Sequence, residues 1–288
     1  MRRLLKEAFA GWWNDRAMSM GAAIAFYTVF SLAPILLAAI AVAGLAFGRE
    51  AAQGAIVLEL GGMLGDKAAE AIEEMIASAS NVGSGIVGTA FGVATFLLLV
   101  SGAIVELQDD LNIIWKVEQR PTSGIAEFVR VRLLSFVMVL GIGFLLMVSL
   151  ILDAGLSAVN AYMERSISGI SLLQVSNQVF SFAVSWFLFA MIFKILPDVD
   201  LTWRDVAMGA FVTAVLFTAG KFLIGVYLGT SAIASSYGAA GSIITLLLWI
   251  YYSSLILLFG AEFTKVFAES RGSRVGKARN SNPAARPR

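Results

Sequence analysis

Long apolar stretches alternate with short polar segments along this chain of 288 residues. Each stretch is at least as long as the roughly 20 residues that an α-helix needs to cross a bilayer. The stretches lie at about 18–46, 85–108, 132–153, 173–196, 206–228 and 239–261. The pattern therefore predicts an all-α polytopic membrane protein with six transmembrane helices.

The polar segments also show helical periodicity in places. Residues 1–17 carry apolar side chains at helical spacing, which predicts a short helix lying on the inner leaflet. In the segment 48–84, five small or branched residues fall on one helical face: Ala68, Ala69, Ile72, Ile76 and Ala79. We expect an amphipathic helix in this outer loop and a second, weaker one at 154–172.

Basic residues are distributed unequally between the two sides of the predicted bundle. Of the 21 Lys and Arg residues, only Arg49, Lys67 and Arg165 fall in the segments after the first, third and fifth stretches, and Lys221 lies inside a stretch. Because cytoplasmic loops are enriched in Lys and Arg, this bias predicts cytoplasmic N- and C-termini. Four tryptophans near predicted boundaries are typical of interfacial anchors: Trp12, Trp13, Trp115 and Trp203.

These features predict three parts of the chain. Residues 1–17 form a cytoplasmic interfacial segment, and residues 18–267 form the six-helix transmembrane domain. Residues 268–288 form a disordered basic cytoplasmic tail, which suits the anionic inner leaflet better than a nucleic acid. We expect membrane lipids as partners and no nucleic acid.

Composition narrows the chemistry. Hydrophobic residues make up 58% of the chain, charged residues 14%, and the mean hydropathy is +0.81. The chain contains no Cys and no His, which excludes disulfides, thiol chemistry and imidazole bases. It also lacks the phosphate-binding pattern GxxxxGK[ST] and acids at two-metal spacing. We therefore expect no enzymatic activity, no cofactor and no metal.

Polar residues at membrane depth are the candidate functional residues, because burying them in lipid is costly. Glu106 and Glu262 close the second and sixth stretches on the inner side. They are candidates for a proton or cation pathway, or for pairing with nearby Arg and Lys. Lys221 lies about 22 Å along the fifth stretch, at a depth similar to that of Asp153. The two could pair, or Lys221 could extend its ammonium outward to water.

Backbone features add further candidates. Pro34 removes a backbone donor near the middle of the first stretch and predicts a kink. This kink either serves packing or lines a cavity. Pairs of glycines at GxxxG spacing favour close helix packing, within one chain or in a homo-oligomer. These pairs are Gly44 with Gly48, Gly88 with Gly92, and Gly225 with Gly229.

Several short motifs follow one another between residues 5 and 267. They are 22–28 (AAIAFYT), 30–34 (FSLAP), 111–115 (LNIIW), 196–199 (LPDV), 203–206 (WRDV), 237–242 (YGAAGS), 248–252 (LWIYY) and 260–262 (GAE). With these motifs the chain resembles the YihY/virulence factor BrkB family. The resemblance implies a bacterial inner-membrane protein of the cell envelope with six transmembrane helices. Members once carried a ribonuclease BN label, which the residues do not support.

The motif at 237–242 also has a physical interpretation. Tyr237, Gly238, Gly241 and Ser242 open the sixth stretch, where free backbone donors at a helix N-terminus suit an anionic group. The alternative is a tight hairpin between the last two stretches. The resemblance and these residues favour a transporter of an ion, a small solute or a lipid-like molecule. A membrane scaffold or an envelope-assembly factor that transports nothing is the alternative.

Overall fold

The computed structural model describes residues 1–64, 72–74, 76–77, 102–117, 170–230 and 241–274. Within these residues every regular element is helical, which confirms the all-α prediction for this part of the chain. The main helices are α1 (Arg2–Asn14), α2 (Ala17–Phe47), α3 (Arg49–Leu64), α7 (Ile170–Ile195), α8 (Trp203–Thr230) and α10 (Gly241–Ser270). Residues 102–114 form a further helix.

Three helices are long and apolar enough to cross a membrane in the part of the chain that the structure describes. Their apolar segments are Gln178–Ile195 in α7, Trp203–Ile224 in α8 and Ile243–Ser270 in α10. They coincide with the fourth, fifth and sixth predicted stretches. The first stretch coincides with α2, in which Ala17–Leu32 is a shorter apolar segment. The third stretch and most of the second lie outside the described residues, so six spans stay a prediction.

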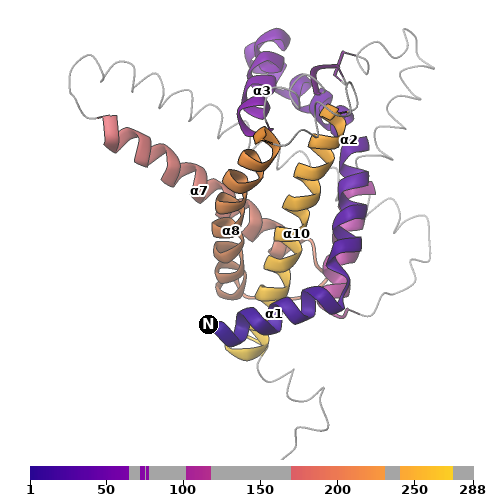
Figure 1. Cartoon of the computed structure of the whole chain (residues 1–288), viewed down its shortest axis with the longest axis vertical. Coiled ribbons are helices and arrows are strands. Elements are labelled where there is room, and N and C mark those ends of the chain that lie inside the picture. The colour runs from indigo at the N-terminus through magenta and orange to yellow at the C-terminus, as the bar shows by residue number, and fades with distance from the viewer. Residues whose placement is uncertain (65–71, 75, 78–101, 118–169, 231–240, 275–288) are drawn as a thin grey trace, which may run out of the picture.

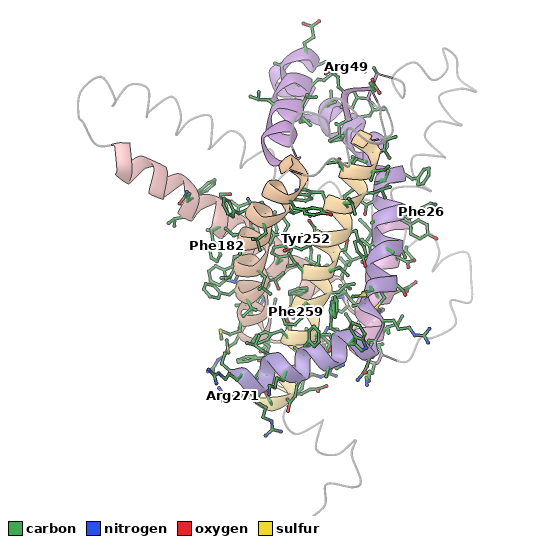
Figure 2. The ribbon with its side chains drawn as sticks, in the orientation of Figure 1. Phe26, Arg49, Phe182, Tyr252, Phe259 and Arg271 are labelled. Carbon is green, nitrogen blue, oxygen red and sulfur yellow. The ribbon has the colours of Figure 1, made fainter. Side chains whose placement is uncertain are left out.

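Helices α8 and α10 form the centre of the described bundle and run side by side (Figure 1). Their contact depends on small residues facing threonines. A Cβ atom on Gly209 would overlap Thr264, and a Cβ atom on Gly260 would overlap Thr213. Near the other end of the contact, Gly220 accommodates the ring of Tyr252, which lies between the two helices (Figure 2). These glycines let the two backbones approach closely.

Other helices enclose this pair. Helix α7 packs against α8, and α2 packs against α10 on the other side (Figure 1). The larger apolar core lies toward the end of the bundle where α1 is found, and its largest fully buried side chain is Phe193. A second core around Ile40 and Leu246 lies toward the other end. The charged and polar groups of the first end therefore lie beside the larger of the two cores.

Helix α1 lies across the ends of the long helices (Figure 1). The short helix predicted for residues 1–17 is confirmed, and its place on the inner leaflet stays a prediction. It packs mainly on α10, with Leu4, Ala8 and Trp12 buried. The indole N–H of Trp12 donates to the carbonyl of Leu255 at 3.2 Å. The prediction of interfacial anchoring is therefore wrong for Trp12, and also for Trp115, which is buried in the larger core. These rings pack within the protein.

The segment after α2 contains more helix than the sequence predicts. Gly48 ends α2 with a φ of +86°, a conformation that favours glycine, and α3 follows at once. The pair Gly44 and Gly48 thus serves a helix terminus, where Gly44 packs on the backbone of Arg49. Residues 72–74 and 76–77 are helical with Ile72 and Ile76 buried, in agreement with the predicted apolar face.

Candidate functional site at the α1 end of the bundle

Glu262 is a buried carboxylate near the end of α10. Glu262 is only 1% exposed, and its Oε2 lies 3.4 Å from the ammonium of Lys265, one turn further along the helix. The same ammonium lies 3.9 Å from Oδ2 of Asp15, in the turn between α1 and α2. One lysine is therefore shared by two carboxylates. The pairing that the sequence suggested for Glu262 is confirmed for Lys265.

This pairing leaves carboxylate oxygens without hydrogen-bond donors. Oε1 of Glu262 and Oδ2 of Asp15 are buried and accept no hydrogen bond within the described part of the chain. The two carboxylates are also close enough to interact with each other. Two acids, each with a buried carboxylate oxygen, face one lysine and leave a surplus of negative charge, which a proton or a bound cation would neutralise.

Helix α1 covers this cluster, and Gly11 makes the close approach possible. A Cβ atom on Gly11 would lie 2.6 Å from Oε2 of Glu262. No side chain could therefore occupy that position without displacing the carboxylate or the helix. The sequence places Gly11 between the apolar residues of α1, where a glycine lowers helix propensity by about 1 kcal/mol relative to alanine. The contact with Glu262 explains its presence there.

A second group of acids lies on the helix at 102–114. Glu106, Asp109 and Asp110 lie along its second half, and Asp110 is buried with Oδ2 accepting no hydrogen bond within the described residues. Burial, and after it the neighbouring charges of Glu106 and Asp109, together raise the pKa of Asp110 to about 7. This carboxyl lies two residues beyond the predicted end of the second stretch. It is therefore poised to change protonation near neutral pH.

This pKa predicts how stability depends on pH. The unfolded carboxyl titrates near 4, so the folded state holds the proton more tightly. The stabilisation is complete below about pH 4 and is lost as the pH rises toward 7. Asp110→Asn should therefore be more stable than the wild type by about 2 to 4 kcal/mol at pH 8, with little difference at pH 4. Thermal unfolding in detergent at both pH values measures this difference.

A suitable control is Asp200→Asn, which removes an exposed carboxylate from the loop between α7 and α8. It should change stability equally little at both pH values. A stability gain for Asp110→Asn that is the same at pH 4 and pH 8 would contradict the assigned pKa.

The helix at 102–114 is fixed to the loop between α7 and α8. The side-chain amide of Asn112 donates to Oδ2 of Asp198 at 2.9 Å, and the backbone N–H of Asp198 donates to Oδ1 of Asn112 at 2.9 Å. Two of the motifs noted in the sequence, 111–115 and 196–199, are thus joined directly. Neither motif alone indicated that the two meet.

The end of α10 is fixed to the start of α8 in a similar way. Asp205 is buried, and its Oδ2 accepts hydrogen bonds from Thr202, from the Ser273 hydroxyl at 2.6 Å and from the Ser273 backbone N–H. Gly272 packs directly against this carboxylate. Asp205 is therefore a structural acid with full hydrogen bonding, in contrast to Glu262 and Asp110.

The other predicted site residues lie away from this cluster. Lys221 is half-buried in α8, with its ammonium 5.8 Å from the ring centre of Phe217. Helix α2 continues through Pro34 without interruption. Gly241 begins α10, and its carbonyl accepts a hydrogen bond from Thr245. The roles proposed for these residues stay predictions.

Three predicted residues, Asp153, Tyr237 and Gly238, lie outside the described residues, as do the glycines Gly88 and Gly92. Ser242 belongs to α10 by its backbone. At the opposite end of the bundle, an open pocket of about 410 Å³ is lined by residues of α3 and by Glu73. None of the predicted site residues lines it, so the buried acids are the better candidate site.

Comparison with known proteins identifies a family for this chain but finds no matching solved structure. The family model described as "Virulence factor BrkB" matches residues 8–285. A protein of Yersinia pestis (strain Pestoides F) named "UPF0761 membrane protein" is 29% identical over 212 residues, which cover 73% of this chain and 67% of that protein. A protein of the same name from Yersinia pseudotuberculosis serotype O:3 (strain YPIII) matches equally well. No solved structure matches the chain.

Proposed function

The chain belongs to the virulence factor BrkB family, and on this premise we propose that it is a bacterial inner-membrane transporter. In this proposal the protein has six transmembrane helices, cytoplasmic termini and no enzymatic activity. It moves an ion, a small solute or a lipid-like molecule. The matched relatives are named membrane proteins, and the charge bias of the loops supports the orientation.

The buried acids around Glu262 are the observation that carries the proposal. A scaffold has no need of a carboxylate that is 1% exposed, shares its lysine with Asp15 and keeps one oxygen without a donor. Ionisable residues within membrane helices are costly, and they often belong to proton or ion pathways. In the proposed mechanism Glu262 alternately binds and releases a proton or a cation, while Lys265 limits the surplus charge.

Flux measurements test this role. We expect the protein in proteoliposomes to show flux driven by a pH or Na⁺ gradient, and we expect Glu262→Gln to abolish it. Glutamine keeps the size of the side chain but cannot exchange a proton or hold a cation by charge. The screen would measure candidate solutes and lipid probes under each gradient, with the wild type and the variant at equal protein density.

Glu7→Gln is the matched control, because Glu7 lies on α1 at the same end of the bundle but is exposed, and Arg3 is its ion-pair partner among the described residues. It should leave flux unchanged. Wild-type flux that survives Glu262→Gln would remove Glu262 from the mechanism. Absence of flux from folded wild-type protein under all gradients and probes would favour the scaffold alternative.

A further inference from the structure

Helix α1 has two apolar rows. Leu4, Ala8 and Trp12 are buried against the bundle. The second row is exposed: Met1 by 60%, Leu5 by 38%, Phe9 by 55% and Trp13 by 60%. Leu5, Phe9 and Trp13 each follow directly after a residue of the buried row, and successive residues are about 100° apart on a helix. The exposed row therefore runs beside the buried row, about a quarter-turn around the helix.

The remaining side of α1 is polar. It carries Arg2, Arg3, Lys6 and Glu7, all exposed. Arg3 pairs with Glu7 at 2.7 Å, so Arg2 and Lys6 account for the surplus positive charge of the helix. Arg2 and Lys6 fall next to the exposed apolar row when the helix is viewed along its axis. Long basic side chains in this position can reach headgroups while their stems cover apolar surface.

The position of α1 in the bundle indicates what each of these three faces meets. The helix crosses the ends of α8 and α10 (Figure 1), and both of these helices contain candidate membrane spans. In the proposed membrane topology, a helix in this position lies along the surface of the bilayer. Its buried row faces α10, its exposed row faces the lipid beside the bundle, and its charged side faces water. Trp203, at the start of α8, is 56% exposed at the same end.

We propose that the exposed row of α1, which consists of Met1, Leu5, Phe9 and Trp13, docks into the headgroup boundary of an anionic bilayer and thereby holds α1 closed over Glu262. Lipid fits this surface better than a second protein, because the basic residues beside the row suit anionic headgroups and the helix lies at membrane-surface level. The lid function rests on the proposed role of Glu262, whereas the docking itself does not.

The contacts of α1 support a lid that can move as a unit. Its buried row contacts α10 through Phe263 and through the hydrogen bond from Trp12 to Leu255. The helix then ends at a short turn in which Arg16 has a left-handed backbone conformation, with φ 58° and ψ 41°. Movement about this turn would carry Gly11 away from Glu262 and expose the carboxylate to water.

Depth measurements test the docking. Because the chain contains no Cys, Phe9→Cys and Glu7→Cys can each carry one environment-sensitive fluorophore in the full-length protein. Glu7 is exposed on the side of α1 opposite the exposed apolar row. The probe vesicles contain phosphatidylcholine with or without phosphatidylglycerol. We expect the Phe9 probe to be blue-shifted and quenched by lipid-borne quenchers, more strongly with phosphatidylglycerol, while the Glu7 probe stays in water. Equal exposure of both probes to water would overturn the proposal.

A labelling rate tests the lid separately. Glu262→Cys should react slowly with a water-soluble maleimide in vesicles that contain phosphatidylglycerol. Adding Phe9→Ser and Trp13→Ser should raise the rate about tenfold or more, given the apolar area that two aromatic side chains lose. Leu58→Ser, at an exposed site on α3, should leave it unchanged. An unchanged rate in the aromatic double variant would show that docking does not close the lid, whatever the flux result.

Discussion

Gly260→Leu is expected to separate α8 from α10 and to lower the free energy of unfolding by about 3 kcal/mol. Even a methyl group at this position overlaps Thr213. Thr213 cannot turn aside freely, because its hydroxyl donates to the carbonyl of Gly209 at 2.8 Å. The reciprocal contact has the same restriction, since the hydroxyl of Thr264 donates to the carbonyl of Gly260 at 2.7 Å. Leucine would therefore force the two helix backbones apart.

Thermal unfolding in detergent, followed by tryptophan fluorescence, measures this loss. Gly54→Leu is the matched control, because in the described part of the chain no atom outside its own helical turn lies within 4 Å of the position that its Cβ atom would occupy in α3. It should be neutral or slightly stabilising, as expected when a helical glycine is replaced. Gly260→Ala should also lower the free energy of unfolding, and adding Thr213→Gly to that variant should recover part of its loss. If Gly260→Leu unfolds at the same temperature as Gly54→Leu, the close packing of α8 and α10 is wrong.

This contact illustrates what hydrophobic patterning cannot provide. The apolar stretches predicted where α2, α7, α8 and α10 begin, with errors of a few residues. This was possible because length and hydropathy alone determine which segments suit a bilayer. The glycine pairs chosen by GxxxG spacing included Gly44 and Gly48, which instead end a helix. The actual contact pairs Gly209 with Thr264 and Gly260 with Thr213, and no spacing within one helix reveals such partners.

The candidate site was likewise only partly predictable from the sequence. Glu262 could be singled out from the sequence because a carboxylate in an apolar segment is unusual. Its partner Lys265 is local, three residues away on the same helix. Gly11 and Asp15 could not be found in this way, because they approach Glu262 only when α1 folds across the end of α10. The pairing of Asn112 with Asp198 is likewise a contact between residues 86 positions apart. One-dimensional patterns carry no direct signal for such contacts.

The charge balance of the Glu262 cluster leads to the second large effect. Lys265→Met is expected to lower the free energy of unfolding by about 3 to 5 kcal/mol, because it leaves buried acids without their cation. The Glu262 side chain is 1% exposed and that of Lys265 is 10% exposed, so water cannot replace the lost ammonium. Methionine keeps most of the length and volume of the lysine stem, which limits the loss of packing.

A double-mutant cycle separates the charge effect from packing. Adding Glu262→Gln to Lys265→Met should restore part of the lost stability, with a coupling of roughly 1 to 3 kcal/mol. Asp15 keeps its carboxylate in the double variant, so full recovery is not expected. Arg3→Met breaks the exposed pair with Glu7 and should have little effect. Additive losses in the cycle would mean that Lys265 does not stabilise Glu262. Restored stability together with lost flux would instead show that the ion pair supports the fold, while the exchangeable carboxylate supports transport.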